Sequence, residues 1–188
     1  MPNNKKRILA ISGSTNLESS STSLLKYIAK TFKDQLEVEI FDGIDKLPHF
    51  NPIQSQVNTP QEVLAFREKI DLADGVIFCT PEYVFSLPGS LKNAIEWNVS
   101  TTVFSNKPVA IIVAAASGEK AFESLKLILT TIEAQVNEEA TLLIKGAKGK
   151  IGKSGEVIDQ ATIEQIDDII AAFCQCIEDK NPIPTKYQ

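Results

Sequence analysis

Short runs of apolar residues recur along the chain and are separated by longer amphipathic or polar segments. The runs at 7–12, 75–80, 109–116 and 140–145 are nearly continuous, which is typical of strands buried on both faces of a sheet. The segment 36–41 alternates apolar with acidic residues, which predicts a further strand close to a sheet edge. The pattern therefore predicts five strands.

Apolar residues at helical spacing fill most of the intervals between these strands. The expected helices are one that follows the hydroxyl cluster at 19–23, one that begins at Pro60, and three over 88–97, 121–132 and 158–177. The segment 42–59 combines glycine, prolines and polar residues, which predicts a long loop.

The alternation of strands with helices predicts a doubly wound α/β fold around a parallel sheet. No segment has the composition of a linker, so we expect a single domain over residues 1–188. In such sheets ligands bind beyond the carboxyl ends of the strands, where the strand order reverses. Function is therefore expected in the loops after the first, third and fourth strands.

Composition and charge exclude several classes of protein. The 188 residues are 43% hydrophobic and 23% charged, which argues against disorder and coiled coil, and the net charge of −5 argues against nucleic-acid binding. No apolar run approaches the ~20 residues that span a membrane. The basic N-terminus precedes only four apolar residues at 8–11, so we expect no signal peptide and a cytoplasmic protein. Three cysteines and one histidine argue against disulfides and a metal site.

Hydroxyl side chains crowd the segment 12–23, which follows the first strand and precedes a helix. Free amides and the positive end of the helix dipole favour phosphate at such a position. The segment has neither the Gly-x-Gly-x-x-Gly pattern of dinucleotide sites nor a Walker A motif. The sequence therefore favours a mononucleotide phosphate, although a flexible serine-rich turn that caps the helix is the simpler alternative.

The loop after the third strand brings aromatic side chains to the expected reversal of strand order. Tyr83 and Phe85 lie between Pro81 and Pro88, and the prolines with Gly89 stiffen the segment. A planar ring resting against this loop is one interpretation, with backbone amides reaching its polar edge. Aromatic packing beneath a loop is the other.

The two loops together resemble the NADPH-dependent FMN reductase family. Gly-Ser-Thr at 13–15 precedes the serine cluster, and the long motif Pro-Glu-Tyr-x-x-Ser-x-Pro-Gly-x-Leu-Lys-Asn-Ala-Ile-Glu-Trp occupies 81–97. The resemblance implies a flavodoxin-like, three-layer α/β/α fold with a five-stranded parallel sheet of order 2-1-3-4-5. It also implies that hydride passes from NADPH or NADH through FMN to a quinone, flavin or similar acceptor.

The resemblance also implies which residues bind the cofactor. Those assigned to the phosphate are Ser14, Asn16, Ser19, Ser21, Thr22 and Ser23. Those assigned to the isoalloxazine ring are Pro81, Glu82, Tyr83, Val84 and Phe85, with Ser117 and Gly118 in the loop after the fourth strand. No catalytic side chain or metal ligand is implied, because the flavin carries the chemistry.

Three positions depart from the family pattern. Asn16 stands where an arginine is common, Val84 where an asparagine is common, and Glu119 lies in a loop that is often richer in glycine. The departures leave two alternatives open: a flavodoxin-type electron carrier, although its Thr-x-Thr-Gly-x-Thr loop is missing, and a non-catalytic interaction protein that has lost its flavin. The resemblance further implies a homodimer or homotetramer, a small-molecule acceptor, and no nucleic-acid or membrane partner.

Overall fold

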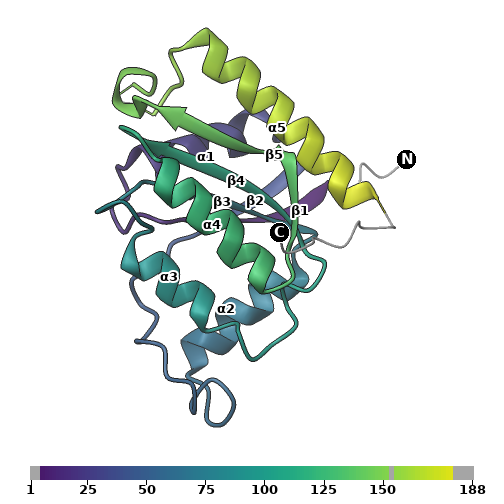
Figure 1. Ribbon diagram of the computed structural model, residues 1–188. Helices are drawn as coiled ribbons and strands as arrows, with labels where there is room; N and C mark the ends of the chain where they lie inside the picture. The colour runs from purple at the N-terminus through teal and green to yellow at the C-terminus, as the bar shows by residue number, and fades with distance from the viewer. Residues whose placement is uncertain (1–4, 153–154, 180–188) are drawn as a thin grey trace.

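The computed structural model describes residues 5–152 and 155–179, and Figure 1 shows the arrangement of the elements. The strands are β1 (Lys6–Ser12), β2 (Leu36–Phe41), β3 (Gly75–Thr80), β4 (Pro108–Ala115) and β5 (Gln135–Lys145). The helices are α1 (Ser20–Thr31), α2 (Gln61–Leu72), α3 (Gly89–Glu96), α4 (Glu119–Thr131), the short 3-10 helix η1 (Ala147–Gly149) and α5 (Gln160–Glu178).

The strands form one parallel sheet of order β2-β1-β3-β4-β5, as predicted. The strand order reverses at β1, which pairs with β2 on one side and with β3 on the other. In this register Ser12 lies opposite Cys79, so β1 and β3 end level with each other. The loops that follow β1 and β3 therefore start side by side at the carboxyl edge of the sheet.

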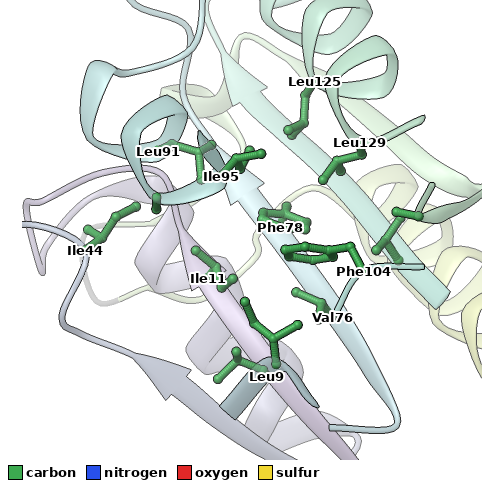
Figure 2. Packing of buried hydrophobic residues seen from close by; sticks show 14 of the residues in the cluster. Leu9, Ile11, Ile44, Val76, Phe78, Leu91, Ile95, Phe104, Leu125 and Leu129 are labelled. Atoms are coloured by element: carbon green, nitrogen blue, oxygen red, sulfur yellow. The ribbon is translucent and has the colours of Figure 1, made fainter. Parts of the chain in front are cut away.

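Helices cover both faces of the sheet, because its strands are apolar on both faces. The helices α1 and α5 pack on one face, where Leu25 and Phe173 meet Ile77 of β3 in one hydrophobic cluster. The helices α2, α3 and α4 pack on the other face. Figure 2 shows this second cluster, with Leu91 and Leu125 above the strand residues. The predicted three-layer α/β/α architecture is confirmed.

Most element boundaries differ from the sequence prediction by one or two residues, and the start of β5 by five. Two of the differences have a local reason. The strand predicted at 140–145 begins at Gln135. Because β5 is an edge strand, its polar residues 137–139 are partly exposed, and the apolar pattern used for the prediction does not include them. A bulge separates the pair Val109–Val136 from the pair Ile111–Thr141 and breaks the apolar pattern. The helix predicted at 121–132 begins at Glu119, because a carboxylate from another loop caps it.

The predicted long loop at 42–59 contains no helix or strand, and α3 holds it in place. The Asn93 side chain accepts a hydrogen bond from the Phe50 amide at 2.7 Å and donates one to Pro48 O at 3.0 Å. The Trp97 indole also donates to Pro48 O at 2.7 Å. Arg67 of α2 donates to Ser55 and to the Trp97 carbonyl. The Lys-Asn-Ala-Ile-Glu-Trp part of the motif thus fixes a loop rather than a ligand.

Replacing Asn93→Ala should lower the free energy of unfolding by about 1–3 kcal/mol, because it leaves the half-buried Phe50 amide without its acceptor. Urea denaturation followed by circular dichroism measures this loss. Lys92→Ala is the matched control, because its ammonium makes only a surface ion pair with Glu96, worth about 0–1 kcal/mol. Equal losses in the two variants would contradict the anchoring role of Asn93.

Candidate functional site

The loop between β1 and α1 is held by a network of its own hydroxyls. Ser12 Oγ and Ser19 Oγ each lie 3.0 Å from Thr22 Oγ1, and Thr22 Oγ1 donates to the Asn16 carbonyl at 3.3 Å. Ser14 Oγ accepts a hydrogen bond from the Asn16 amide at 3.2 Å. Four of the predicted phosphate residues are therefore joined in one cluster, with Ser12 as a fifth member.

The N-terminus of α1 keeps amides that point beyond the helix. Ser19 is the N-cap, and its hydroxyl accepts from the Thr22 amide at 3.2 Å. The amides of Ser20 and Ser21 precede the first intrahelical hydrogen bond and have no partner within residues 5–152 and 155–179. The first turn contains no acidic residue. These amides and the helix dipole give α1 the character of an anion site.

The Ser21 side chain lies beneath this loop rather than in it. Its hydroxyl is buried and makes no hydrogen bond of ordinary geometry within the described part of the chain, although it adjoins the Cys79 thiol. Burial raises the pKa of the Cys79 thiol to about 12. The thiol is therefore protonated at neutral pH and is no nucleophile. Only the Ser21 amide is placed to meet a phosphate.

A glycine brings this loop against the end of β3. A Cβ atom at Gly13 would lie 2.1 Å from Thr80 Oγ1, so no side chain fits there. The Gly13 amide also donates to the Cys79 carbonyl at 2.8 Å. The close approach joins the predicted phosphate loop to the predicted ring loop, which begins at Pro81.

The loop after β3 contains a tight turn with an unusual backbone. Tyr83 and Ser86 exchange two backbone hydrogen bonds of 3.0 Å, and the residues between them, Val84 and Phe85, have φ angles of 52° and 54°. Two consecutive positive φ angles define a type I′ turn, which normally takes glycine or asparagine. A β-branched valine in this region costs about 1–3 kcal/mol. Strain of this size is typical of functional loops.

The turn presents its apolar side chains to solvent. Val84 is 95% exposed and Phe85 is 77% exposed. The Tyr83 amide is used within the turn, whereas the Val84 and Phe85 amides have no partner among the described residues. Of the three amides expected to reach the polar edge of a ring, two are therefore available.

Glu82 connects this turn to the loop after β4. Its carboxylate accepts hydrogen bonds from the amides of Gly118, Lys120 and Ala121 at 3.2, 3.0 and 3.1 Å. The N-cap of α4 is Gly118, which has no side chain to cap the helix. Glu82 supplies the missing cap from a distant part of the sequence and places its negative charge at the positive end of the dipole.

The loop after β4 is fixed on its other side as well. Glu119 pairs with Lys145 at the end of β5, and Ser117 Oγ donates to Glu119 at 3.1 Å. The Lys145 ammonium and the Ser117 hydroxyl hold the pKa of Glu119 below its usual value. Gly118 has a φ of 90°, and a Cβ atom there would lie 2.7 Å from Leu143. Ser117 and Gly118 therefore stand beside Glu82, as the predicted grouping requires.

Two cavities adjoin the β1–α1 loop. A cavity of about 190 Å³ lies between this loop and the loop after β2. It is smaller than the roughly 300–1,000 Å³ of most ligand pockets, so it has room for only part of a ligand. Its lining includes Ser14 and Thr22 together with Asp42, Asp45 and Lys46. The last three were missed by sequence analysis, although the end of the second strand necessarily lies at the same edge.

The larger cavity, of about 760 Å³, lies along the outer side of α1. Its lining includes Ser23, Lys26, Tyr27 and Lys30 but no residue of the loops after β3 and β4. We place the site at the sheet edge despite this difference in size, because ligands of doubly wound folds bind there. Ser23 lines this larger cavity and not the one at the sheet edge.

A doubly wound sheet with a hydroxyl-rich loop after β1 and a strained turn after β3 is typical of a nucleotide-binding protein of flavodoxin-like architecture. The chain belongs to the NADPH-dependent FMN reductase family, whose model matches residues 6–149. The predicted family, fold and oxidoreductase class are confirmed, and so are the predicted cofactors, FMN with NADPH or NADH.

Similar proteins that are named for such activities support this assignment. The NADH-dependent flavin reductase subunit 2 of Lactobacillus johnsonii is 35% identical and covers 92% of this chain and 97% of its own. The quinone reductase of Escherichia coli K12 is 29% identical, with coverages of 93% and 96%. The solved structure of the NAD(P)H:(acceptor) oxidoreductase FerB from Paracoccus denitrificans is 26% identical, with coverages of 92% and 97% and a TM-score of 0.75. The individual cofactor contacts of this chain stay predictions.

Replacing Val84→Asn should raise the free energy of unfolding by about 1 kcal/mol, because asparagine tolerates the left-handed conformation that strains valine. Urea denaturation compares the variant with the unaltered chain. Val99→Asn serves as control, because Val99 is also exposed but lies outside the left-handed region. A change at Val84 no larger than that at Val99 would remove the argument for strain.

Proposed function

We propose that this chain is an NAD(P)H-dependent FMN oxidoreductase that binds FMN at the carboxyl edge of its sheet and reduces a small quinone, flavin or similar acceptor. The observation that carries the proposal is the hydrogen-bonded junction of Glu82 with the loop after β4, next to a turn whose Val84 and Phe85 amides have no partner among the described residues. Membership of the FMN reductase family supports the activity.

The residues present fit FMN at both of its ends. The amides of Ser20 and Ser21 and the neighbouring hydroxyls offer donors to a phosphate, and no carboxylate lies in the first turn of α1. The amides of Val84 and Phe85 offer donors to the polar edge of a ring. The contact between Gly13 and Thr80 joins the segments that follow the adjoining strands β1 and β3 and that carry these two sets of donors.

The protein contributes binding and orientation, whereas bound FMN supplies the hydride chemistry by accepting a hydride from nicotinamide and delivering it onward. The Val84–Phe85 turn offers backbone amides and leaves apolar side chains to cover a ring. Glu82 holds the loop after β4 at Gly118, so the distance between this loop and the Val84–Phe85 turn is fixed before a ligand binds. Preorganised donors of this kind lose little freedom on binding.

The finer parts of the proposal concern the setting of the enzyme. Within the described residues no helix is long and apolar enough to cross a membrane. We include in the proposal a single domain over residues 1–188, a cytoplasmic location and a homodimer or homotetramer. The exposed Val84 and Phe85 support the last of these, because solvent-facing apolar side chains beside a site favour a covering surface.

The deciding experiment is an absorption spectrum of the chain purified without added flavin and again after reconstitution with FMN and desalting. We expect flavin bands to stay with the protein and to bleach with NADPH or NADH, and a quinone to restore them. Protein that retains no flavin after reconstitution, or flavin that neither nicotinamide bleaches, would overturn the proposal.

Replacing Asn16→Arg should tighten the binding of FMN about tenfold, because a guanidinium adds a charge-assisted contact to the phosphate. Riboflavin has no phosphate, so its affinity should stay unchanged. Fluorescence quenching measures both. Gln35→Arg is the control, because it adds the same charge at the amino edge of the sheet, where Gln35 immediately precedes β2. An equal gain for riboflavin, or for the control, would contradict a phosphate at this loop.

A further inference from the structure

The Glu82 carboxylate joins its own loop to a segment that is far away in the sequence, because both of its oxygens accept hydrogen bonds from residues 118–121. Oε1 accepts from Gly118, and Oε2 accepts from Lys120 and Ala121. The side chain belongs to the residue directly before the strained turn, and its partners form the first turn of α4. One carboxylate thus spans the two segments that flank the proposed ring site.

This geometry makes Glu82 more than a helix cap. A local cap would satisfy the α4 amides equally well, but it would leave the Tyr83–Ser86 turn free to move relative to the helix. The turn also needs stabilising contacts from outside, because the left-handed conformations of Val84 and Phe85 persist only when the surroundings enforce them. Glu82 provides such contacts from the position directly before the turn.

The same contact determines which helix is free to bind an anion. The first-turn amides of α4 at Lys120 and Ala121 are already occupied by a carboxylate. In α1 the corresponding Ser21 amide has no partner within the described residues, and the corresponding Thr22 amide is held only by the neutral Ser19 hydroxyl. An anionic group in the site therefore meets an attractive helix terminus at α1 and a neutralised one at α4.

We propose that Glu82 is a positioning residue, which fixes the Val84–Phe85 turn against the Gly118 loop so that the two walls of the flavin ring site stay at a constant separation. The proposal rests on the proposed FMN-dependent function. It assigns Glu82 no contact with the flavin, so its side chain acts through the amides of α4. The ring should sense the loss of this contact, whereas the phosphate should not.

The test compares Glu82→Gln with the unaltered chain in titrations with FMN and with riboflavin, followed by fluorescence quenching. Glutamine keeps the length of the side chain but turns one acceptor into an NH₂ group that faces amide donors. A hydrogen bond to a charged group is worth enough for about a tenfold change in affinity, so we expect both dissociation constants to rise by that factor. Equal factors for the two ligands locate the damage at the ring.

Glu123→Gln is the matched control. Glu123 lies on the same helix and loses the same charge, but its carboxylate contacts only Lys120 on the surface. We expect flavin affinities within twofold of the unaltered chain. Glu82→Gln with unchanged affinity for both ligands would overturn the proposal, even if its unfolding in urea were easier, because a merely structural cap affects stability alone. An unaltered chain that binds neither ligand would instead overturn the proposed function.

Amide hydrogen exchange keeps the proposal testable if Glu82→Gln fails to fold. In the unaltered chain, riboflavin binding should slow exchange at Gly118, Lys120 and Ala121, because a ligand that contacts the turn also stabilises the amides tied to it. Glu82→Asp, which keeps the charge but is one methylene shorter, should show faster exchange at these amides. Unchanged exchange on adding riboflavin at a concentration that saturates the site would overturn the proposal.

Discussion

Five strands that run in one direction end at one edge of a sheet, and each following loop is delivered to that edge. The reversal of strand order at β1 then separates the helix that follows β1 from the helices that follow β2 and β3, which lie on the other face. The close contact of Gly13 with Thr80 joins the loop after β1 to the end of β3 at this reversal. The position of every proposed cofactor contact depends on this one constraint.

At this edge the chain uses two helix N-termini in opposite ways. The α4 terminus is filled by the Glu82 carboxylate and so becomes part of a rigid wall. The α1 terminus is capped only by the neutral Ser19 hydroxyl and keeps free amides. Because a carboxylate cancels the dipole that attracts anions, the capping chemistry supports the proposed positions of the phosphate at α1 and of the uncharged ring near α4.

Much of the fold was accessible from sequence, because buried parallel strands carry an unbroken apolar signal and the loops between them carry prolines and glycines. The β3 run is buried along its whole length, and its boundaries match the prediction. The signal fails where tertiary contacts replace local ones. The early start of α4 depends on Glu82, which no window around residues 119–121 contains.

The site residues also divide into those that a local sequence pattern predicts and those that it does not. Ser14, Asn16, Ser19 and Thr22 gather because they share one loop, which a sequence motif describes well. Ser23 lies one residue further along α1 and lines the larger cavity instead of the one at the sheet edge. The left-handed backbone of Val84 could not be predicted from the sequence, because valine is among the least expected residues for that conformation.

The departure at Asn16 has a structural meaning beyond the missing charge. Its side chain accepts from the Glu18 amide at 2.9 Å, and its carbonyl accepts from the Ser19 amide and the Thr22 hydroxyl. The loop is therefore closed by its own groups, and a phosphate must compete with hydrogen bonds that already exist. Since the net worth of such an exchange is small, these internal hydrogen bonds lower the free energy that a phosphate gains at this loop.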